Sequence, residues 1–340
     1  MSASGGTRAV IAALLANLGI ALTKFLAWGL TGSSSMLAES IHSVADSGNQ
    51  ALLLLGGRRA RRQATPEHPF GYGRERYIYA FIVAIVLFAV GGLFALYEAY
   101  HKFRHPQPIT SWHWVPVAVL VIALTMEAFS FRTAIHEARQ VRGRSSWKDF
   151  IRRAKAPELP VVLLEDFAAL VGLVLALVGV GLTLATGSGV WDAAATAAIG
   201  ALLVVIAVVL AAETKSLLLG EAASPEDCQA IERAILQGSE VERIIHMRTL
   251  HLGPEELLVA AKIAVSAADT GAQIARSIDA VESRIRAAVP IARVIYLEPD
   301  IYRPHDGGEN AAGAPGGLAG VEGPAGAVRL AKDSGSGHAS

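Results

Sequence analysis

Long apolar runs separated by short polar segments are the dominant pattern of this chain. Each run reaches roughly 20 residues, which is enough for a helix to cross the hydrocarbon core of a bilayer. The runs predict six membrane-spanning helices, over residues 9–30, 36–55, 77–100, 112–134, 160–185 and 190–212. Glycines and prolines in the intervening segments are typical of helix ends and turns. We therefore expect residues 1–213 to form an all-α membrane domain.

The pattern changes after residue 213 to that of a small soluble domain. Ser224 is followed by a proline and two acidic residues, which is typical of a helix start, and this helix is predicted to reach Leu236. Alternating and helical periodicities then predict strands at 243–252, 257–265 and 292–298 and a helix at 270–289. The order α-β-β-α-β favours an open sheet covered on one face by helices, as in ferredoxin-like folds. Residues 214–305 are expected to form this cytoplasmic α+β domain, and residues 306–340, rich in Gly, Ala and Pro, a disordered tail.

Composition and charge placement support the membrane interpretation. The chain is 52% hydrophobic and 18% charged, with a mean hydropathy of +0.41. Lys and Arg concentrate in the segments between runs two and three and between runs four and five. The positive-inside rule places both segments, and hence both termini, in the cytoplasm of a multi-pass integral membrane protein, for which we expect a bacterial plasma membrane. The single cysteine excludes an intramolecular disulfide and thiolate zinc clusters.

Polar residues within the second apolar run are the main functional signal. Four polar residues share one stripe of a helix here: Glu39, and then His42, Asp46 and Asn49, which follow it by three, seven and ten residues. Ionisable groups inside a membrane are costly and usually mark a functional site. A simple hydrogen-bonded contact between helices is the alternative interpretation of the stripe.

Further polar residues interrupt three other runs. In the fifth, Glu165 and Asp166 are neighbours, so their side chains point about 100° apart and only one can face a given site directly. Two single polar residues, Glu127 in the fourth run and Asn17 in the first, are each interpreted as a partner in helix packing. Lys24 in the first run is expected to extend toward the nearer membrane interface.

An imidazole combined with carboxylates is a ligand set that suits Zn²⁺. Co²⁺, Ni²⁺, Cd²⁺ and Fe²⁺ accept the same ligands. These groups must lose protons to bind a metal, so metal and protons compete for them. Such competition would couple metal movement to proton movement.

Several motifs together resemble the cation diffusion facilitator family of divalent-metal transporters. They are the Gly-Ser-Ser-Ser-Met-Leu-Ala-Glu-Ser-Ile-His-Ser lead-in, the His-x-x-x-Asp of the second run, the His-Pro-Phe-Gly-Tyr-Gly segment before the third, and the aspartate of the fifth. The strings around Asp46 and Asp166 are similar to those of the zinc transporter nine subgroup. The resemblance covers the chain to about residue 304.

The resemblance implies a homodimeric exporter that moves Zn²⁺ or a similar ion out of the cytoplasm against protons, with no other cofactor and no nucleic-acid partner. It assigns His42, Asp46 and Asp166 as metal ligands. The fourth position of the common pattern falls on Val162, which cannot bind a metal. Additional ligands or proton-path groups are then expected among the remaining polar residues, with water as a further candidate: Glu39, Asn49, Glu165 and Glu127.

Other metal positions of the family are weakly represented. His68 matches a histidine of a cytoplasmic-loop site, but Tyr72 stands where a second histidine is common. The last strand carries Tyr296 and Glu298 where a histidine and an aspartate often bind regulatory zinc. His246 and His251, near the first strand, are interpreted as surface residues, so the C-terminal domain is expected to dimerise rather than to sense metal.

Two functions from other classes remain open. A membrane enzyme with a metal-activated water is disfavoured, because the chain has no His-Glu-x-x-His motif and no nucleophile elbow. A metal-sensing or scaffold protein with impaired transport is compatible with the valine in the ligand pattern. We therefore expect a secondary transporter and not an enzyme.

Overall fold

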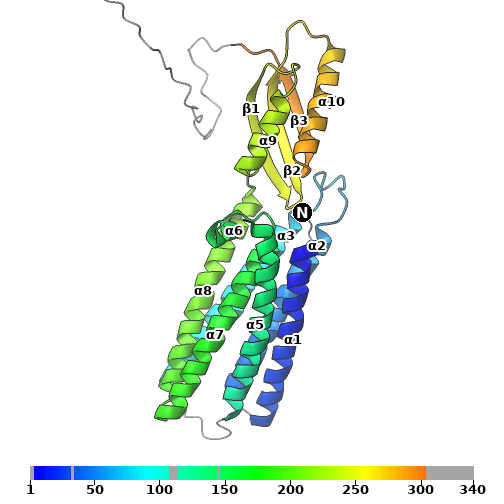
Figure 1. The fold of residues 1–340 in the computed structure, drawn as a ribbon. Coiled ribbons are helices and arrows are strands. Elements are labelled where there is room, and N and C mark those ends of the chain that lie inside the picture. The colour runs from blue at the N-terminus through cyan, green and yellow to red at the C-terminus, as the bar shows by residue number, and fades with distance from the viewer. Residues whose placement is uncertain (1–3, 32–33, 107–113, 144–145, 304–340) are drawn as a thin grey trace, which may run out of the picture. The chain divides into compact units, whose positions relative to one another are not determined.

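The computed structural model describes residues 4–31, 34–106, 114–143 and 146–303. The side chains at several positions of the first two helices, Glu39 and His42 among them, lie outside this description. The longer helices, drawn in Figure 1, are α1 (Ser4–Thr31), α2 (Ser34–Arg59), α5 (Trp114–Arg142), α7 (Glu158–Thr186) and α8 (Val190–Leu219). A further helical stretch consists of α3 (Glu75–Val86), η1 (Leu87–Leu93) and α4 (Phe94–Arg104), and α6 (Trp147–Arg153) is a short helix.

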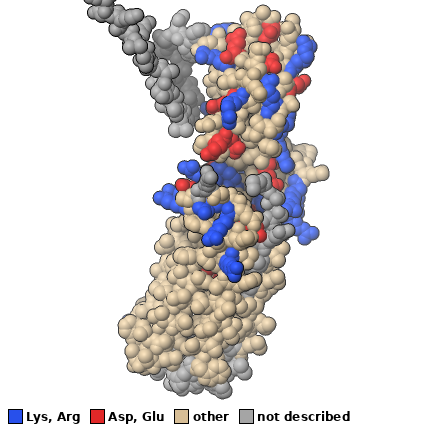
Figure 2. All heavy atoms as spheres, in the orientation of Figure 1, with Lys and Arg blue, Asp and Glu red and all other residues tan. Residues whose placement is uncertain are grey.

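A membrane-type helical region is confirmed. Among the described residues, four helical stretches are long and apolar enough to cross a bilayer: Glu75–Arg104, Trp114–Arg142, Glu158–Thr186 and Val190–Leu219. Helices α1 and α2 have 28 and 26 residues, but the polar residues of α2 lower its mean hydropathy. On the face of the helices seen in Figure 2 the surface is almost entirely uncharged, with Lys and Arg gathered at one end. This distribution fits an integral membrane protein.

Two helical segments differ from the sequence expectation. The third run forms one continuous helical stretch, but residues Leu87–Leu93 have π-helical hydrogen bonding. This segment contains Gly92, where an added Cβ would lie 2.6 Å from Val204 Cγ2 of α8, so the glycine permits close packing of the two helices. The fourth helix was predicted to end at residue 134, yet α5 continues to Arg142 and α6 follows. Ser146 caps α6 by accepting a hydrogen bond from the backbone N–H of Asp149 at 3.0 Å.

Helix α7 lies at the centre of the contacts that matter for function. It packs against α1, α5 and α8, while α1 also packs against α2 and α5. The apolar core around α7 includes Leu53 of α2, Val83 of α3, Val162 of α7 and Leu210 of α8, all at most 2% exposed. Residues of α1, α2, α5 and α7 that face inward therefore meet one another.

A small C-terminal sheet domain follows the helices, as expected. Its elements are α9 (Pro225–Leu236), β1 (Arg243–Gly253), β2 (Glu256–Ala264), α10 (Gly271–Ala288) and β3 (Ala292–Asp300). The strand order is β1-β2-β3, with β1 antiparallel and β3 parallel to β2. Alternate residues of β2 pack against Ile231 and Ile235 of α9 and Val281 and Ile285 of α10, which are fully buried. The helices thus form the core on one face of the sheet.

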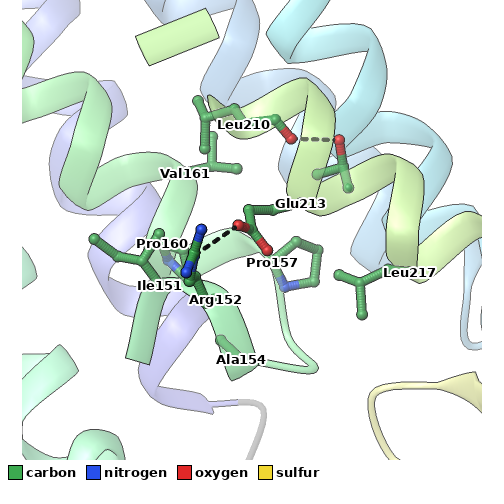
Figure 3. A pocket seen from close by; sticks show the side chains of 10 residues that line it. Ile151, Arg152, Ala154, Pro157, Pro160, Val161, Leu210, Glu213 and Leu217 are labelled. Atoms are coloured by element: carbon green, nitrogen blue, oxygen red, sulfur yellow. Dashed lines mark hydrogen bonds and ion pairs between the residues drawn. The ribbon is translucent and has the colours of Figure 1, made fainter. Parts of the chain in front are cut away.

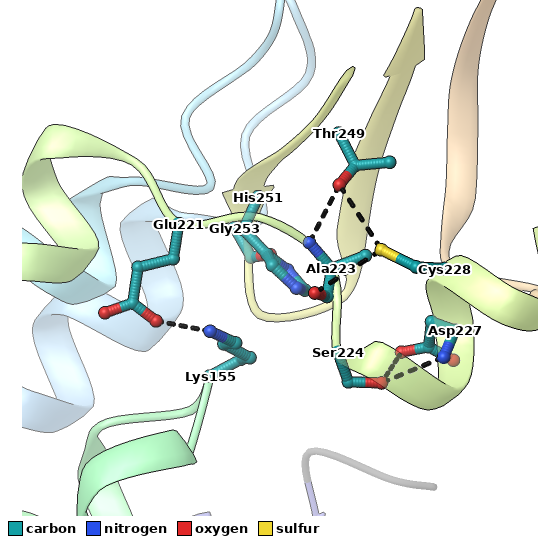
Figure 4. A network of polar contacts seen from close by, with 9 residues as sticks. All are labelled: Lys155, Glu221, Ala223, Ser224, Asp227, Cys228, Thr249, His251 and Gly253. Atoms are coloured by element: carbon teal, nitrogen blue, oxygen red, sulfur yellow. Dashed lines mark hydrogen bonds and ion pairs between the residues drawn. The ribbon is translucent and has the colours of Figure 1, made fainter. Parts of the chain in front are cut away.

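His251 is buried in this domain, so the prediction that it is a surface residue is wrong, whereas His246 is exposed. The His251 side chain is 2% exposed, and its Nδ1 lies 3.3 Å from the carbonyl oxygen of Gly253. Its backbone N–H donates to the carbonyl oxygen of Glu221 at 2.9 Å, and Figure 4 shows the Glu221 carboxylate paired with Lys155. Burial lowers the pKa of His251, and it outweighs the opposite effects of the Gly253 carbonyl and of nearby Asp227 and Glu221. Lys155 lowers this pKa further.

The lowered pKa of His251 predicts a loss of domain stability in mild acid. The folded domain holds the ring neutral, whereas the unfolded chain binds a proton near the ordinary pKa of about 6.5, so folding free energy is lost as the pH falls below that value. The protection factors of the β1 amides in the full-length protein, which are exchange rates corrected for the intrinsic effect of pH, should therefore decrease between pH 7.5 and pH 5.5. His251→Gln should reduce this dependence and His246→Gln should leave it unchanged. Equal pH dependence in both variants would contradict the assignment to His251.

Candidate functional site

Glu165 lies at the centre of a buried hydrogen-bond network that joins three helices. Asn49 Nδ2 of α2 donates to Glu165 Oε1 at 2.7 Å, and Gln50 Nε2 donates to Oε2 at 2.8 Å. The carbonyl oxygen of Gln50 accepts from Asn17 Nδ2 of α1 at 3.2 Å. All four side chains are buried, and both carboxylate oxygens of Glu165 are used. Glu165 therefore connects α7 to α2, and through Gln50 to α1.

Asp166 points toward a different helix, as the 100° rotation between neighbouring residues requires. Its Oδ2 accepts a hydrogen bond from Ser130 Oγ of α5 at 2.8 Å, and the residue is 1% exposed. Val162, one turn earlier on α7, is fully buried in the apolar core. No polar side chain on α7 thus takes the place of the missing ligand at that position.

A cavity of ≈ 40 Å³ lies beside these residues, between α1, α2, α5, α7 and α8. Its polar lining comes from Asn17, Lys24, Ser43, Asp46 and Glu127. A buried cavity of about 10–15 Å³ suffices for one water molecule, so this one has room for more than one. Asp46 and Glu127 are 7% and 2% exposed, and both therefore face the cavity and not the surroundings of the bundle.

Four carboxylates of this region interact with one another electrostatically. Glu127 interacts with Asp46 and Asp166, Asp46 also interacts with Asp166, and Glu165 interacts with all three. Among the described side chains, which do not include His42 or Glu39, no group of three or more His, Cys, Asp or Glu has the arrangement of a metal-binding cluster. The predicted ligands Asp46 and Asp166 are thus gathered in one region, and the contribution of His42 lies outside the described residues.

The remaining predicted residues lie elsewhere or have other partners. Asn49 and Glu165 bind each other, so neither is an uncommitted ligand, although Asn49 Oδ1 is buried without a hydrogen-bond partner. His68 is exposed in the loop before α3, where its ring packs edge-on against Tyr72 with centroids 4.7 Å apart. The side chain of Glu39, like that of His42, is not described.

Lys24 differs from its sequence expectation. It does not extend toward an interface, since the residue is 4% exposed and Nζ donates to Ser43 Oγ of α2 at 2.9 Å. Polar partners within the bundle replace the water that an interface would supply. Lys24 is seven residues after Asn17, so both lie on one face of α1.

Sequence reasoning also overlooked Ser43, Gln50 and Ser130. Ser43 and Gln50 lie three residues before and four residues after Asp46, on the same face of α2. Ser130 follows Glu127 by one helical turn on α5. Helical spacing from a known polar residue would have identified all three.

A second cavity lies among α6, α7 and α8 and has different chemistry (Figure 3). It is lined mainly by apolar side chains, including Pro157, Val161 and Leu217, and contains one ion pair, Arg152 Nε to Glu213 Oε1 at 3.8 Å. None of the predicted metal ligands lines it. The cavity next to Asp46 is accordingly the candidate site.

Comparison with known proteins shows the family to which the helical region is similar. Residues 10–219 match the cation efflux transmembrane domain. The chain is 34% identical to the mouse protein named proton-coupled zinc antiporter SLC30A9, mitochondrial, over 233 residues, which cover 68% of this chain and 41% of that protein. It is 28% identical to metal tolerance protein C4 of Arabidopsis thaliana over 260 residues, 75% of this chain and 56% of the relative.

A third relative is the manganese efflux system protein MneP of Bacillus subtilis, 26% identical over 258 residues, which cover 74% of this chain and 81% of that protein. The chain spans less than half the length of the SLC30A9 proteins that it matches. The family model covers more than half of the chain, including every described residue of the candidate site. The chain therefore belongs to the cation diffusion facilitator family, the cation efflux proteins.

Proposed function

We propose that this protein is a secondary transporter that exports a divalent metal cation, most readily Zn²⁺, in exchange for protons. The observation that carries the proposal is the cavity beside Asp46 and Glu127, with Asp166 close by, inside a bundle of membrane-type helices. Buried carboxylates without a function would be expensive in such a bundle. The names of relatives, which include a proton-coupled zinc antiporter and a manganese efflux protein, support the same reaction class.

The proposed ligands are His42, Asp46 and Asp166, with Glu127 as the added carboxylate. Glu127 takes precedence over Glu165 because both oxygens of Glu165 already accept hydrogen bonds from α2. A nitrogen donor with carboxylates favours Zn²⁺ over Mg²⁺ or Mn²⁺, which prefer oxygen ligands. Water completes the coordination in the absence of a ligand from Val162.

Proton exchange follows from the same ligands. A carboxylate or imidazole that holds a proton cannot hold the metal, so proton binding on one side releases the metal there. Alternating access would expose the site to the two sides of the membrane in turn, through rocking of helices around it. The metal is the substrate, and the protein performs no covalent chemistry on it.

The membrane arrangement is part of the proposal. Helices α1 and α2 complete six spans, and the basic segments after α2 and α5 face the cytoplasm together with both termini. The protein acts as a homodimer, to which the C-terminal domain contributes. The bacterial plasma membrane stays a prediction, since the relatives include a mitochondrial protein and a Bacillus protein.

A flux assay in reconstituted vesicles tests the proposal. Wild-type protein should accumulate Zn²⁺ when a pH gradient is imposed, and His42→Ala or Asp46→Ala should reduce the rate by more than the roughly 10- to 100-fold effect of removing a group that only positions a ligand. Collapse of the gradient with a protonophore should slow the uptake. Zn²⁺ flux unaffected by these changes would falsify the proposed site.

A specific observation keeps one alternative, a metal sensor or scaffold, in the test. Val162 removes one ligand of the usual pattern and is buried in the apolar core. If purified protein binds Zn²⁺ tightly and vesicles show no flux with Zn²⁺, Co²⁺, Mn²⁺ or Cd²⁺, the sensor function is supported and the transporter function is rejected.

A further inference from the structure

Lys24 places a cationic side chain inside the proposed metal site. The residue is 4% exposed, and its ammonium group donates to Ser43 at 2.9 Å. The cavity that Lys24 lines is also lined by Asp46 and Glu127. An ammonium group in a membrane interior costs several kcal/mol unless anionic or polar groups stabilise it. Asp46 and Glu127, as acidic residues of the same cavity, are placed to contribute to this stabilisation.

The geometry of α2 links the lysine to the predicted ligand. Ser43 precedes Asp46 by three residues, so the hydroxyl that holds the ammonium and the carboxylate lie on the same face of the helix. Glu127 enters the cavity from α5, and its carboxylate interacts electrostatically with Lys24. Lys24 is thus held at the wall of the cavity between two helices that carry anionic groups.

We propose that Lys24 is a resident cation of the site, which balances Asp46 and Glu127 when no metal is bound and weakens metal binding enough for release. This inference rests on the proposed transport function and adds a residue that tunes metal affinity and turnover. A bound divalent cation and the ammonium repel each other inside the bundle, where charge interactions are stronger than in water. Metal binding must therefore overcome repulsion by the lysine, and the flexible lysine side chain returns to the carboxylates when the metal leaves.

The role predicts opposite effects on affinity and turnover. Lys24→Met keeps the length and the apolar stem of the side chain and removes its charge. The Kd for Zn²⁺ of the purified full-length protein at constant pH should fall by about tenfold or more, because a repulsive charge is gone. In vesicles the KM should fall with it, while the rate at saturating Zn²⁺ should fall several-fold because release becomes slow. Lys24→Arg should keep an affinity near that of the wild type.

Two controls separate this role from a merely structural one. Lys215→Met removes an exposed lysine near the end of α8 and should change neither the Kd nor the rate. If Lys24→Met alone does not fold, the comparison is made between Glu127→Gln and the double variant Lys24→Met/Glu127→Gln. In the double variant Glu127 carries no charge, so the loss of the Lys24 charge leaves one anion fewer without a counter-charge. The double variant should still bind Zn²⁺ more tightly than Glu127→Gln.

The outcomes distinguish the inference from the proposed function. A wild-type protein that neither binds nor moves Zn²⁺ rejects the proposed function itself. If the wild type binds and moves Zn²⁺, two results overturn the role of Lys24 alone. Either Lys24→Met binds Zn²⁺ no more tightly than the wild type, or the double variant binds it no more tightly than Glu127→Gln. Tighter binding with slower turnover supports it.

Discussion

Replacing Asp166 with asparagine is expected to reduce Zn²⁺ flux more than 100-fold while leaving the helix bundle folded. Asparagine has nearly the same shape, and one of its side-chain atoms can still accept the hydrogen bond that Ser130 now donates to Asp166 at 2.8 Å. The substitution removes the negative charge that offsets the metal and the group that can exchange it for a proton. Loss of a ligand should reduce the flux by more than the roughly 10- to 100-fold that follows from removing a group that only positions a ligand.

Ser130→Ala provides the graded comparison. It leaves the charge of Asp166 in place and removes only the hydroxyl group that orients it, so the flux should fall within that 10- to 100-fold range. Initial rates of Zn²⁺ uptake in vesicles, normalised to the amount of folded protein, measure both variants. Equal losses in the two would mean that orientation, and not ligand charge, limits transport. Full activity of Asp166→Asn would remove Asp166 from the site.

Much of the helical region could be predicted because membrane solvation leaves a simple trace in the sequence. A span needs about 20 apolar residues, and four predicted runs coincide with helices that meet this requirement. Polar residues inside such runs stand out, which is how Asp46, Glu127 and Asp166 were found. The small C-terminal sheet domain was equally predictable, because alternation and helical spacing differ clearly there.

Partner choice between helices could not be read from the chain. Periodicity gives the face of a helix but not the neighbour that the face meets, so neither the bond of Asp166 to Ser130 nor that of Glu165 to Asn49 was foreseeable. Lys24 shows the same limit in another form. A long basic side chain can reach either an interface or an interior anion, and only the packing of α1 against α2 decides between them. The π-helical segment Leu87–Leu93, which packs against α8, was likewise not predicted from the apolar run that contains it.

Replacing Glu165 with leucine is expected to destabilise the bundle more than any other single change in the Glu165 network. Leucine fills similar space but leaves the amide groups of Asn49 and Gln50 without the acceptors that they now reach at 2.7 and 2.8 Å. An orphaned buried donor costs about 1–3 kcal/mol, and interhelical bonds in membranes are often at the low end of such values, so the pair should cost about 2 kcal/mol or more. In detergent this corresponds to a Tm lower by roughly 5 °C.

The triple variant Glu165→Leu, Asn49→Leu and Gln50→Leu shows whether the lost bonds cause the effect. When both partners of a hydrogen bond are replaced by apolar groups, no donor is left unsatisfied, and much of the stability should return. Gln50 also accepts from Asn17, so recovery should be incomplete unless Asn17→Leu is added. A Tm of Glu165→Leu equal to that of the wild type would show that the network contributes no stability. Glu165 would then be free to act as a ligand, and Glu127 would lose the reason for which it was preferred.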